Sequence, residues 1–411
     1  MTRKSGAMVG EFMKCVDTER RYVIGLMSGT SGDGIDAALV RIGRVGDHLT
    51  VSLEKALYEP YQTAERARIF AAFSSGFSAA QMGALNRDLG FWFARAVHHL
   101  LEEAGVAPDA VQVIGCHGQT IVHCPPGQSG DGSGFSIQIG DPAVIAGHTG
   151  IDVVSHFRAN DMALGGQGAP MIPYFDYALF HSQTENRVIL NIGGIANVTI
   201  LNREMGPLEI LGFDTGPGNM VLDGLTELAT QGRLHYDRDG ELARSGHVQA
   251  DLLQQWLRHP YFDRHPPKSC GREQFGQSYC AQLFRDARLH GLSNADLLRT
   301  ATELVGVSIA RAIQPYVRSP WALIVSGGGI HNPVLMEVVE KYSHSMHGWE
   351  STEAFGVPGD FKEAMGFALF AWEFCQGVPT NVPCVTGARR LTMQGSWTPA
   401  RTGTRLYGGA V

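Results

Sequence analysis

The sequence predicts an α/β protein made of two diverged copies of one α/β unit. The first observation is the length, because 411 residues exceed the roughly 250–300 residues beyond which a single hydrophobic core seldom grows. The second is a repeated order of elements, in which an apolar strand, a glycine turn and two further strands begin near Tyr22 and again near Arg187. Helical segments follow in both halves. The repeat is one of order alone, since the residues themselves do not repeat.

The first copy begins as an antiparallel meander of strands and continues with helices. Its strands are short apolar runs separated by turns, and they are expected at residues 22–27, 35–42, 49–57, 111–115, 120–123 and 151–154. Apolar residues three and four positions apart predict helices at 64–72 and 79–104. A third helix is expected to begin at Pro142, because proline fits the first helical turn. Residues 124–134 are typical of an exposed loop.

The second copy repeats this order and ends with a longer series of helices. Its strands are expected at residues 187–192, 196–201, 208–213 and 321–325. Its helices are expected at residues 219–231, 248–257, 279–289, 295–316 and 361–373, with another that begins at Asn332-Pro333. We therefore predict one domain at 1–158 plus 374–411 and a second domain at 159–373.

Composition and charge argue against several classes of protein. Lys and Arg number 33 against 40 Asp and Glu, so the net charge is −7, and no basic cluster marks a nucleic-acid-binding face. No run of about 18 apolar residues suggests a membrane span, and the first 21 residues lack the apolar segment of a signal peptide. Seven cysteines without a CxxC pair favour a reducing, cytoplasmic location. No GxGxxG follows a strand, so dinucleotide binding is disfavoured.

Glycine is the unusual feature of the composition. It makes up 51 of 411 residues, about 12% against an average near 7%. The glycine turns Ser28–Gly34 and Gly193-Gly194 follow the first strand of each copy, and successive N–H groups in such turns bind anions. An ordinary hairpin explains either turn alone, but two in matching places favour a polyphosphate bound between paired domains. Gly327-Gly328-Gly329 is a third candidate, for a nucleotide, although a loose strand–helix connection is the alternative.

Carboxylates near the predicted turns could supply the chemistry that phosphoryl transfer needs. Asp214 lies at a predicted strand end between glycines, although a buried turn-capping aspartate would explain it too. Asp33 and Asp36 flank the first glycine turn, where either could reach a metal through water or simply close the turn. Glu363 opens a helix, and a favourable charge at a helix N-terminus is its alternative explanation.

Polar residues between the two copies predict a substrate contact. Arg158 suits a substrate carboxylate because its guanidinium can pair with two oxygens at once, and an interdomain salt bridge explains it equally well.

The pairs Cys116-His117 and His123-Cys124 match no common zinc spacing and border strands. We therefore interpret both histidines as structural.

Nine motifs, in order along the chain, resemble those of the anhydro-N-acetylmuramic acid kinase family. They are IGLMSGTSGDGIDAALV (24–40), IGCHGQTIVH (114–123), IQIGDPAVIA (137–146), FRANDMALGGQGAPMIP (157–173), NIGGIANVT (191–199), GFDTGPGN (212–219), PPKSCGRE (266–273), SGGGIHNPVLM (326–336) and EAMGFAL (363–369). The resemblance runs from about Tyr22 to the C-terminus. It is specific, because the set is far longer than any phosphate loop shared among kinases.

The resemblance implies a fold and an activity. The family belongs to the sugar kinase, heat-shock-protein-70 and actin superfamily, whose duplicated ribonuclease H-like α/β domains enclose a nucleotide cleft. Its members are expected to use ATP, Mg²⁺ and water to convert 1,6-anhydro-N-acetylmuramic acid to N-acetylmuramic acid 6-phosphate. The implied setting is peptidoglycan recycling in the bacterial cytoplasm, carried out by a homodimer.

The resemblance also implies roles for individual residues. Asp214 matches the catalytic base. The first phosphate loop and its flanking carboxylate comprise Ser28, Gly29, Thr30, Ser31, Gly32, Asp33, Gly34 and Asp36, and the second loop is Gly193 and Gly194. The nucleoside contacts are Gly327, Gly328 and Gly329, and the sugar contacts are Arg158, Asp161 and Glu363. No metal ligand is assigned, although Asp33 or Asp36 could bind Mg²⁺ through water.

Two features depart from the family pattern. Position 32 is usually a larger apolar residue such as Leu, and Gly32 is expected to alter nucleotide affinity through a more mobile loop. Residues 1–21 and 125–134 extend beyond the usual pattern, and we assign them no role.

Three other functions fit parts of the sequence. A kinase of the same fold that acts on an ordinary hydroxyl would use Asp214 to deprotonate that hydroxyl directly. A nucleotide-switched protein of the actin or chaperone type would need a peptide-binding or polymer contact, and no appended module of that kind is visible. A glycosidase with paired carboxylates would leave three glycine motifs without a purpose.

Overall fold

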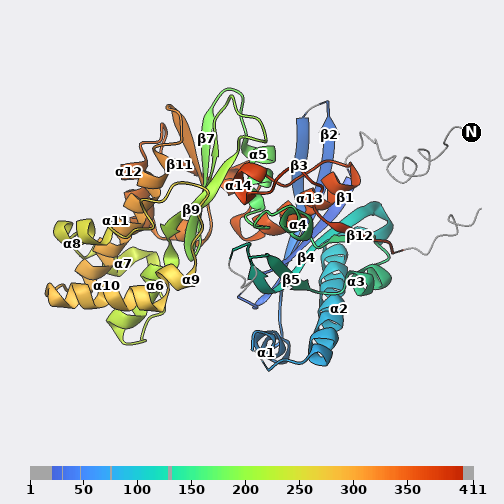
Figure 1. The fold of residues 1–411 in the computed structure, drawn as a ribbon, viewed down its shortest axis with the longest axis horizontal. Coiled ribbons are helices and arrows are strands. Elements are labelled where there is room, and N and C mark those ends of the chain that lie inside the picture. Colours follow the sequence, from blue (N-terminus) through green and yellow to red (C-terminus); the bar gives the residue numbers. More distant parts are fainter. Residues whose placement is uncertain (1–20, 30, 47, 75, 128–131, 401–411) are drawn as a thin grey trace, which may run out of the picture. The chain divides into compact units, whose positions relative to one another are not determined.

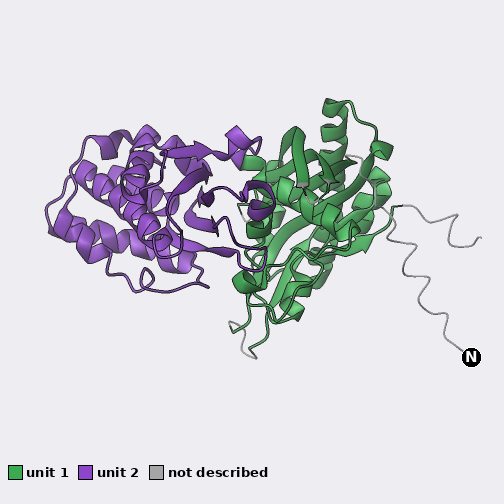
Figure 2. Cartoon of the chain, turned by 90° about the horizontal axis from the view of Figure 1, so that it is seen from above, with its two compact units in different colours: residues 1–175, 360–411 green, residues 176–359 purple. Residues whose placement is uncertain are grey.

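The computed structural model describes residues 21–29, 31–46, 48–74, 76–127 and 132–400. The chain forms two compact units, which are Met1–Phe175 with Asp360–Val411 (unit 1) and Asp176–Gly359 (unit 2) (Figure 2). Each unit contains one β-sheet with helices packed on it (Figure 1). The predicted α/β class is therefore confirmed.

Unit 1 is built on a mixed sheet of seven strands. These are β1 (Arg21–Ser28), β2 (Gly34–Val45), β3 (His48–Pro60), β4 (Val111–Cys124), β5 (Phe135–Ile139), β6 (Val153–Ser155) and β12 (Ser396–Thr398). The strand order is β12-β6-β4-β1-β2-β3, and β5 pairs with β4 outside this path. β1, β2 and β3 form an antiparallel meander, while β4 and β6 add in parallel on the other side of β1.

Unit 2 repeats this topology with five strands. They are β7 (Asn186–Ile192), β8 (Ile195–Leu201), β9 (Leu211–Pro217), β10 (Trp321–Ser326) and β11 (Trp349–Ser351), in the order β11-β10-β7-β8-β9. β7, β8 and β9 form an antiparallel meander, and β10 and β11 add in parallel beyond β7. The shared strand order confirms the predicted duplication and agrees with the ribonuclease H-like unit that the family resemblance implies.

Helices pack on both sheets and complete the two cores. In unit 1 they are α1 (Thr63–Ala72), α2 (Ala79–Ala104), α3 (Pro142–Thr149), α4 (Ala159–Ala163), α13 (Lys362–Cys375) and α14 (Pro383–Thr386), and α5 (Ile172–Phe180) spans the unit boundary. In unit 2 they are α6 (Asn219–Thr230), α7 (Glu241–Arg244), α8 (Ala250–Trp256), α9 (Arg272–Phe275), α10 (Gln277–Leu289), α11 (Asn294–Ile313) and α12 (Pro333–Ser343). Leu85 and Phe93 of α2 are fully buried in the first core, and Leu304 and Ile309 of α11 are fully buried in the second.

The boundaries between the units differ from the predicted ones at 158/159 and 373/374. The structure places them at 175/176 and 359/360, because α13 packs on β1, β2 and β4 of unit 1. A Cβ atom on Gly25 of β1 would lie only 1.7 Å from Ala364 O, so strand and helix meet backbone to backbone. The apolar surface of a helix does not reveal in the sequence which of two sheets it covers.

Most predicted elements are confirmed to within a few residues, and the differences have physical causes. The strands predicted at 111–115 and 120–123 form the single strand β4, because pairing with β1 continues as far as Gln119. The strand predicted at 208–213 is β9, which begins later, at Leu211, and continues to Pro217 because β8 pairs with it over that length. β5, β11 and β12 escape prediction because segments of three to five residues are too short to show a period.

Two expectations from the composition, on membrane spans and on cysteines, can be compared with the structure. No helix within the described ranges is both long and apolar enough to cross a membrane. The six cysteines in the same ranges are free. Burial raises the pKa of Cys116 to about 12 and that of Cys280 to about 11, so both remain protonated thiols at neutral pH.

Candidate active site

The first glycine turn connects β1 to β2 and is fixed by buried polar contacts. Ser28 Oγ lies 3.0 Å from Gly34 O, 2.9 Å from Tyr61 OH and 2.6 Å from Gln119 Oε1. Gln119 also donates from Nε2 to Gly29 O at 3.1 Å. Because the Ser28 side chain is completely buried, it shapes the turn from beneath. This differs from the prediction, in which the Ser28 hydroxyl contacts the phosphate.

The exposed part of the turn lies between Gly29 and Asp33. Ser31 and Asp33 are exposed, and Ser31 Oγ donates to Asp33 Oδ1 at 2.7 Å. Gly32 N donates to Gly29 O at 3.1 Å, which closes the turn. Thr30 lies outside the described residues. The turn thus offers backbone and side-chain polar groups at the place where a phosphate is predicted to bind.

Gly32 adopts the left-handed conformation, with a φ of +58°. A Cβ atom at this position would lie 3.4 Å from Ile69 Cγ2 and 3.7 Å from the Phe70 ring. A larger apolar residue would therefore find space against α1, but it would carry backbone strain that glycine avoids. The effect of Gly32 on nucleotide affinity stays a prediction.

Acidic side chains gather beside the first turn. The pKa of Asp36 is raised to about 7, mainly by burial. The negative charges of Asp33, Glu363 and Asp360 act in the same direction. Clustered carboxylates beside a turn that is predicted to bind phosphate would fit Mg²⁺, which takes oxygen ligands and usually keeps waters and phosphate oxygens. Within the described residues no three His, Cys, Asp or Glu side chains could enclose a metal ion, so water and phosphate would have to complete its shell.

The predicted sugar contacts all belong to unit 1, and two of them are accessible. Arg158 immediately precedes α4 and is half-buried. Glu363, in the first turn of α13, is exposed. Part of the residue is open to solvent, but the surrounding protein still desolvates the carboxylate and raises its pKa, against the opposing positive charges of Arg158 and Lys362. A positive and a negative group are thus available in unit 1 for a polar substrate.

Asp161 is completely buried, which does not fit the predicted contact with the sugar. Its Oδ1 accepts hydrogen bonds from Thr386 Oγ1 at 2.8 Å and Asn381 Nδ2 at 3.1 Å. Its Oδ2 accepts from Gly168 N at 2.8 Å. The residue therefore holds the loop that ends at Gly168 in place, and sequence reasoning could not distinguish this role from ligand binding.

Asp214 lies on β9 of unit 2 and is held from two directions. Its Oδ2 accepts a hydrogen bond from Cys270 N at 2.9 Å, and its backbone O accepts one from Tyr261 OH at 2.7 Å. Its backbone N donates to Lys268 O at 3.2 Å. These contacts fix the main chain and one carboxylate oxygen, whereas no donor from the described part of the chain contacts Oδ1.

The surroundings of Asp214 favour a base that is ionised at neutral pH. Burial raises its pKa to about 6, and the negative charge of Glu273 acts in the same direction. The Cys270 N–H bond and the positive charge of Lys268 oppose the increase. Lys268 Nζ lies 4.8 Å from the centroid of the Tyr261 ring. General bases are most effective when their pKa lies near the operating pH, and Asp214 meets this condition.

The second glycine turn, between β7 and β8, is packed against the start of α6. Gly193 O accepts a hydrogen bond from Asn219 N at 2.8 Å, and Gly194 O accepts one from Met220 N at 3.1 Å. The turn therefore supports the chain that follows Asp214, and it also lines a cavity.

The glycine triple after β10 approaches the end of β7. A Cβ atom on Gly327 would lie 2.7 Å from Ile192 O, and one on Gly329 would lie 2.3 Å from Ile192 Cγ2. Gly328 alone of the three is exposed, and a Cβ atom there would lie 3.6 Å from Asn219 Nδ2. Packing explains two of the three glycines, and Gly328 is the one that a nucleoside could touch.

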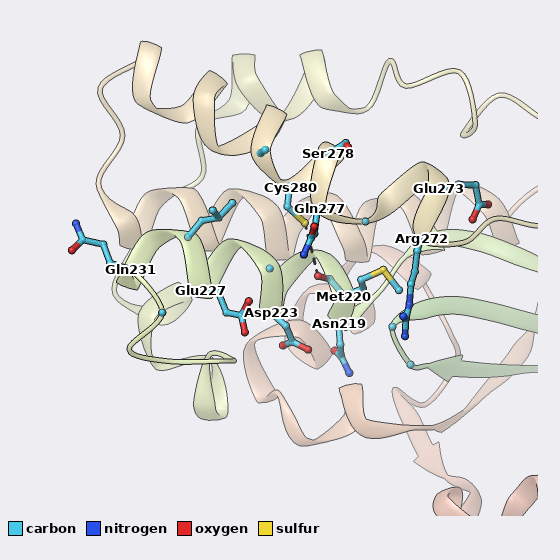
Figure 3. A pocket seen from close by; sticks show the side chains of 17 residues that line it. Asn219, Met220, Asp223, Glu227, Gln231, Arg272, Glu273, Gln277, Ser278 and Cys280 are labelled. Carbon is cyan, nitrogen blue, oxygen red and sulfur yellow. Dashed lines mark hydrogen bonds between the residues drawn. The ribbon is translucent and has the colours of Figure 1, made fainter. Parts of the chain in front are cut away.

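Two adjoining cavities of unit 2 share residues of α6. The larger, of about 1270 Å³, is lined by the second glycine turn, α6, α9 and α10 (Figure 3). Asn219, Asp223 and Glu227 follow one another along the same side of α6 in this view. The smaller, of about 640 Å³, contains Gly328 and shares Asn219 and Asp223 with the larger. Unit 2 therefore brings the glycines predicted to bind phosphate and nucleoside to neighbouring hollows.

Comparison with known proteins decides the family. Residues 21–400 match the family model of anhydro-N-acetylmuramic acid kinase. The chain belongs to this family. An anhydro-N-acetylmuramic acid kinase from Salinibacter ruber is 43% identical over 383 residues, which cover 92% of this chain and 96% of that protein. Its namesake from Gloeobacter violaceus is 41% identical over 379 residues, which cover 92% and 98%.

Solved structures show more distant likenesses. A xylulose kinase from Rhodospirillum rubrum is 12% identical, with a TM-score of 0.44 and coverage of 86% of this chain and 91% of that one. The activator of 2-hydroxyisocaproyl-CoA dehydratase from Clostridium difficile, with bound ADPNP, is 11% identical, with a TM-score of 0.42 and coverage of 86% and 96%. Membership of the anhydro-N-acetylmuramic acid kinase family rests on the sequence relationship alone.

Several site residues of this anhydro-N-acetylmuramic acid kinase family member escape sequence reasoning. Cys270 N–H and Tyr261 OH fix Asp214 from 56 and 47 positions away. His117, predicted to be structural, lies 41 positions from Arg158 and contacts it. The fold alone brings such pairs together. The available signal was the family resemblance, since the motifs PPKSCGRE and IGCHGQTIVH contain Cys270 and His117.

Proposed function

We propose that this chain converts 1,6-anhydro-N-acetylmuramic acid, ATP and water to N-acetylmuramic acid 6-phosphate and ADP. Family membership supplies the substrate class. The observation that carries the chemistry is Asp214, whose Oδ2 is held by Cys270 N–H and whose pKa is raised to about 6 by burial. A fixed carboxylate with this pKa suits proton abstraction from water at neutral pH.

The bond changes follow from the structure of the substrate. An anhydro sugar has no free 6-hydroxyl, because O6 is bonded to C1. Water attacks C1 while Asp214 accepts its proton, and the C1–O6 bond breaks. O6 attacks the γ-phosphorus of ATP, and ADP leaves with the electrons of the broken phosphoanhydride bond. The proton on Asp214 then returns to solvent.

Other groups are proposed to position the reactants. The exposed part of the first glycine turn and Gly193-Gly194 would contact phosphates, and Gly328 would contact the nucleoside. Arg158 and Glu363 would contact the sugar. Fixed donors directed at the transferred phosphoryl group stabilise its charge without reorganisation during the reaction. Asp33 and Asp36 would hold Mg²⁺ through water, and the bound ion supplies neutralisation of phosphate charge.

The cellular setting completes the proposal. Reuse of an anhydro amino sugar belongs to peptidoglycan recycling, and the cytoplasm supplies the ATP. A homodimer is proposed on the family resemblance alone.

Formation of ADP tests the proposed function. The full-length chain is incubated with Mg²⁺ and ATP, either alone, with the anhydro sugar, or with ring-opened N-acetylmuramic acid. We expect one ADP per anhydro sugar consumed and little ADP in the other two mixtures. Equal turnover of the ring-opened sugar would instead indicate an ordinary hydroxyl kinase. ADP release that is independent of sugar would indicate a nucleotide-switched protein.

A further inference from the structure

The guanidinium of Arg158 is held by two neutral acceptors within unit 1. Its Nε–H donates to His117 Nε2 at 3.1 Å, and its Nη1 donates to Gly168 O at 2.7 Å. An arginine has five N–H donors. These two bonds therefore leave one N–H on Nη1 and two on Nη2, which lie at the outer end of the planar group.

His117 can accept this hydrogen bond in only one protonation state. Because arginine is always a donor, Nε2 of His117 carries no proton, and the proton on Nδ1 is donated to Gly118 O at 3.0 Å. The ring is almost completely buried and packs 4.7 Å from the Phe367 ring of α13. The hydrogen bonds to Arg158 and Gly118 thus require the neutral tautomer of His117 that carries its proton on Nδ1.

The charged groups that surround His117 favour the same neutral state. Arg158 lies on one side and His123 lies further along β4. Burial lowers the pKa of Arg158, and the negative charge of Glu363 in α13 opposes this change. Burial first, and then the positive charge of Arg158, hold the pKa of His117 well below its usual value. His117 therefore stays an acceptor throughout the neutral pH range.

The second acceptor, Gly168 O, is fixed by a separate chain of contacts. Gly168 N is bound by the buried Asp161 carboxylate at 2.8 Å. Thr386 and Asn381 in turn hold the other oxygen of Asp161. The guanidinium is consequently braced from β4 on one side and from the loop ending at Gly168 on the other.

Because both hydrogen-bond acceptors of Arg158 are neutral, its positive charge remains available to bind an anion. Within the described residues, no ion pair shorter than 4 Å joins Arg158 to a carboxylate, although Glu363 is near enough to influence its pKa. A carboxylate partner would have neutralised the group. The two outer nitrogens of a guanidinium match the two oxygens of a carboxylate in a bidentate pair.

We propose that His117 is a positioning residue which, together with Gly168 O, orients the outer edge of the Arg158 guanidinium to bind the lactyl carboxylate of the sugar. This inference rests on the proposed function, because it takes the anhydro sugar as the substrate. It goes further by assigning the discrimination between a muramic acid and a glucosamine sugar to one braced arginine.

Two substitutions of His117 separate this role from a purely structural one. His117→Phe keeps an aromatic ring but removes the acceptor, whereas His117→Gln retains a carbonyl oxygen that can reach the same donor. The substrates are 1,6-anhydro-N-acetylmuramic acid and 1,6-anhydro-N-acetylglucosamine, the same bicyclic sugar without the lactyl group. His123→Phe is the matched control, because His123 has no hydrogen bond to Arg158 and donates or accepts at Ser136 instead.

For His117→Phe we expect KM for the muramic sugar to rise about 10- to 100-fold, the range for losing a hydrogen bond to a charged group. KM for ATP and for the glucosamine sugar should change little. The ratio of kcat/KM for the muramic sugar to that for the glucosamine sugar should therefore decrease. His117→Gln should restore most of the preference. In an Arg158→Met background, His117→Phe should cause no further loss of preference.

Several outcomes would overturn the inference. One is an unchanged sugar preference in a folded His117→Phe variant, and another is an equal loss in His123→Phe. A third is an additive effect of His117→Phe in the Arg158→Met background. If His117→Phe does not fold, a His117→Gln variant that loses the preference contradicts the proposal as well. Failure of the proposed function is a different result, in which the wild-type chain phosphorylates neither sugar.

Discussion

Replacing Asp214 by Asn is expected to lower kcat by about 10²–10⁴-fold, the usual contribution of a general base, while ATP and the anhydro sugar still bind. An amide of the same shape can still accept from Cys270 N–H, so the turn should survive, but it cannot take a proton from water. Single-turnover kinetics and binding titrations of both ligands measure the two effects separately.

The pH dependence of the same enzyme supplies the signature of the base. Because burial raises the pKa of Asp214 to about 6, the carboxylate becomes protonated as the pH falls through that value. Wild-type kcat/KM should therefore decrease below pH about 6, tenfold per unit, and the residual activity of Asp214→Asn should lack this limb. Asp251→Asn, a change at an exposed residue of α8, is the control and should behave as wild type. Near-normal turnover by Asp214→Asn would rule out the assignment.

Replacing Gly25 by Ala is expected to destabilise unit 1 severely. The added Cβ would lie 1.7 Å from Ala364 O and 2.7 Å from Ala368 N. Both are backbone atoms of α13, so neither can move aside as a flexible side chain would, and the helix must separate from the sheet. We expect a loss of about 3 kcal/mol or more, at the upper end of overpacking effects, and a Tm lower by about 6–12 °C.

Gly83→Ala is the matched control for this substitution. Gly83 lies within α2 of the same unit, and a Cβ atom there would meet nothing within 4 Å. Alanine should stabilise the helix by about 0.5–1 kcal/mol, so Tm should rise slightly. Thermal unfolding of the three proteins measures both effects. If Gly25→Ala melts like the wild type, α13 does not pack against β1 as closely as described, and the boundary at 359/360 loses its support.

The fold could be predicted from the sequence where structure is local. The meanders of both units and the long helices α2 and α11 show in apolar runs and in three- and four-residue spacing, because each segment is long enough to display its period. β12 could not be found this way, since three residues pair with Val153–Ser155 more than 240 positions earlier. The placement of α13 depends on which sheet it covers. The local traces of that choice are Gly25 and Gly115, where a Cβ atom would meet the backbone of α13.

The candidate site could be predicted as positions but not as an arrangement. Asp214 and the glycine turns are conspicuous because glycines flank polar residues. The strand end predicted at Asp214 is wrong, since β9 continues to Pro217. The sequence cannot show that Ser28 and Asp161 are buried, since the same residue type can be either buried or in contact with a ligand. It also cannot show that His117, which is predicted to be structural, accepts a hydrogen bond from Arg158, because the two residues meet only in the folded unit.

Isotope transfer from water is the most direct test of the central claim, that water opens the anhydro ring while O6 receives the phosphate. The reaction is run in ¹⁸O-labelled water, quenched rapidly and examined by mass spectrometry. A sample of N-acetylmuramic acid 6-phosphate kept in the same water for the same time corrects for exchange at C1. We predict one ¹⁸O atom at C1 of the product and none in its phosphate group. Label in inorganic phosphate, with unlabelled C1, would contradict the mechanism and indicate simple hydrolysis of ATP.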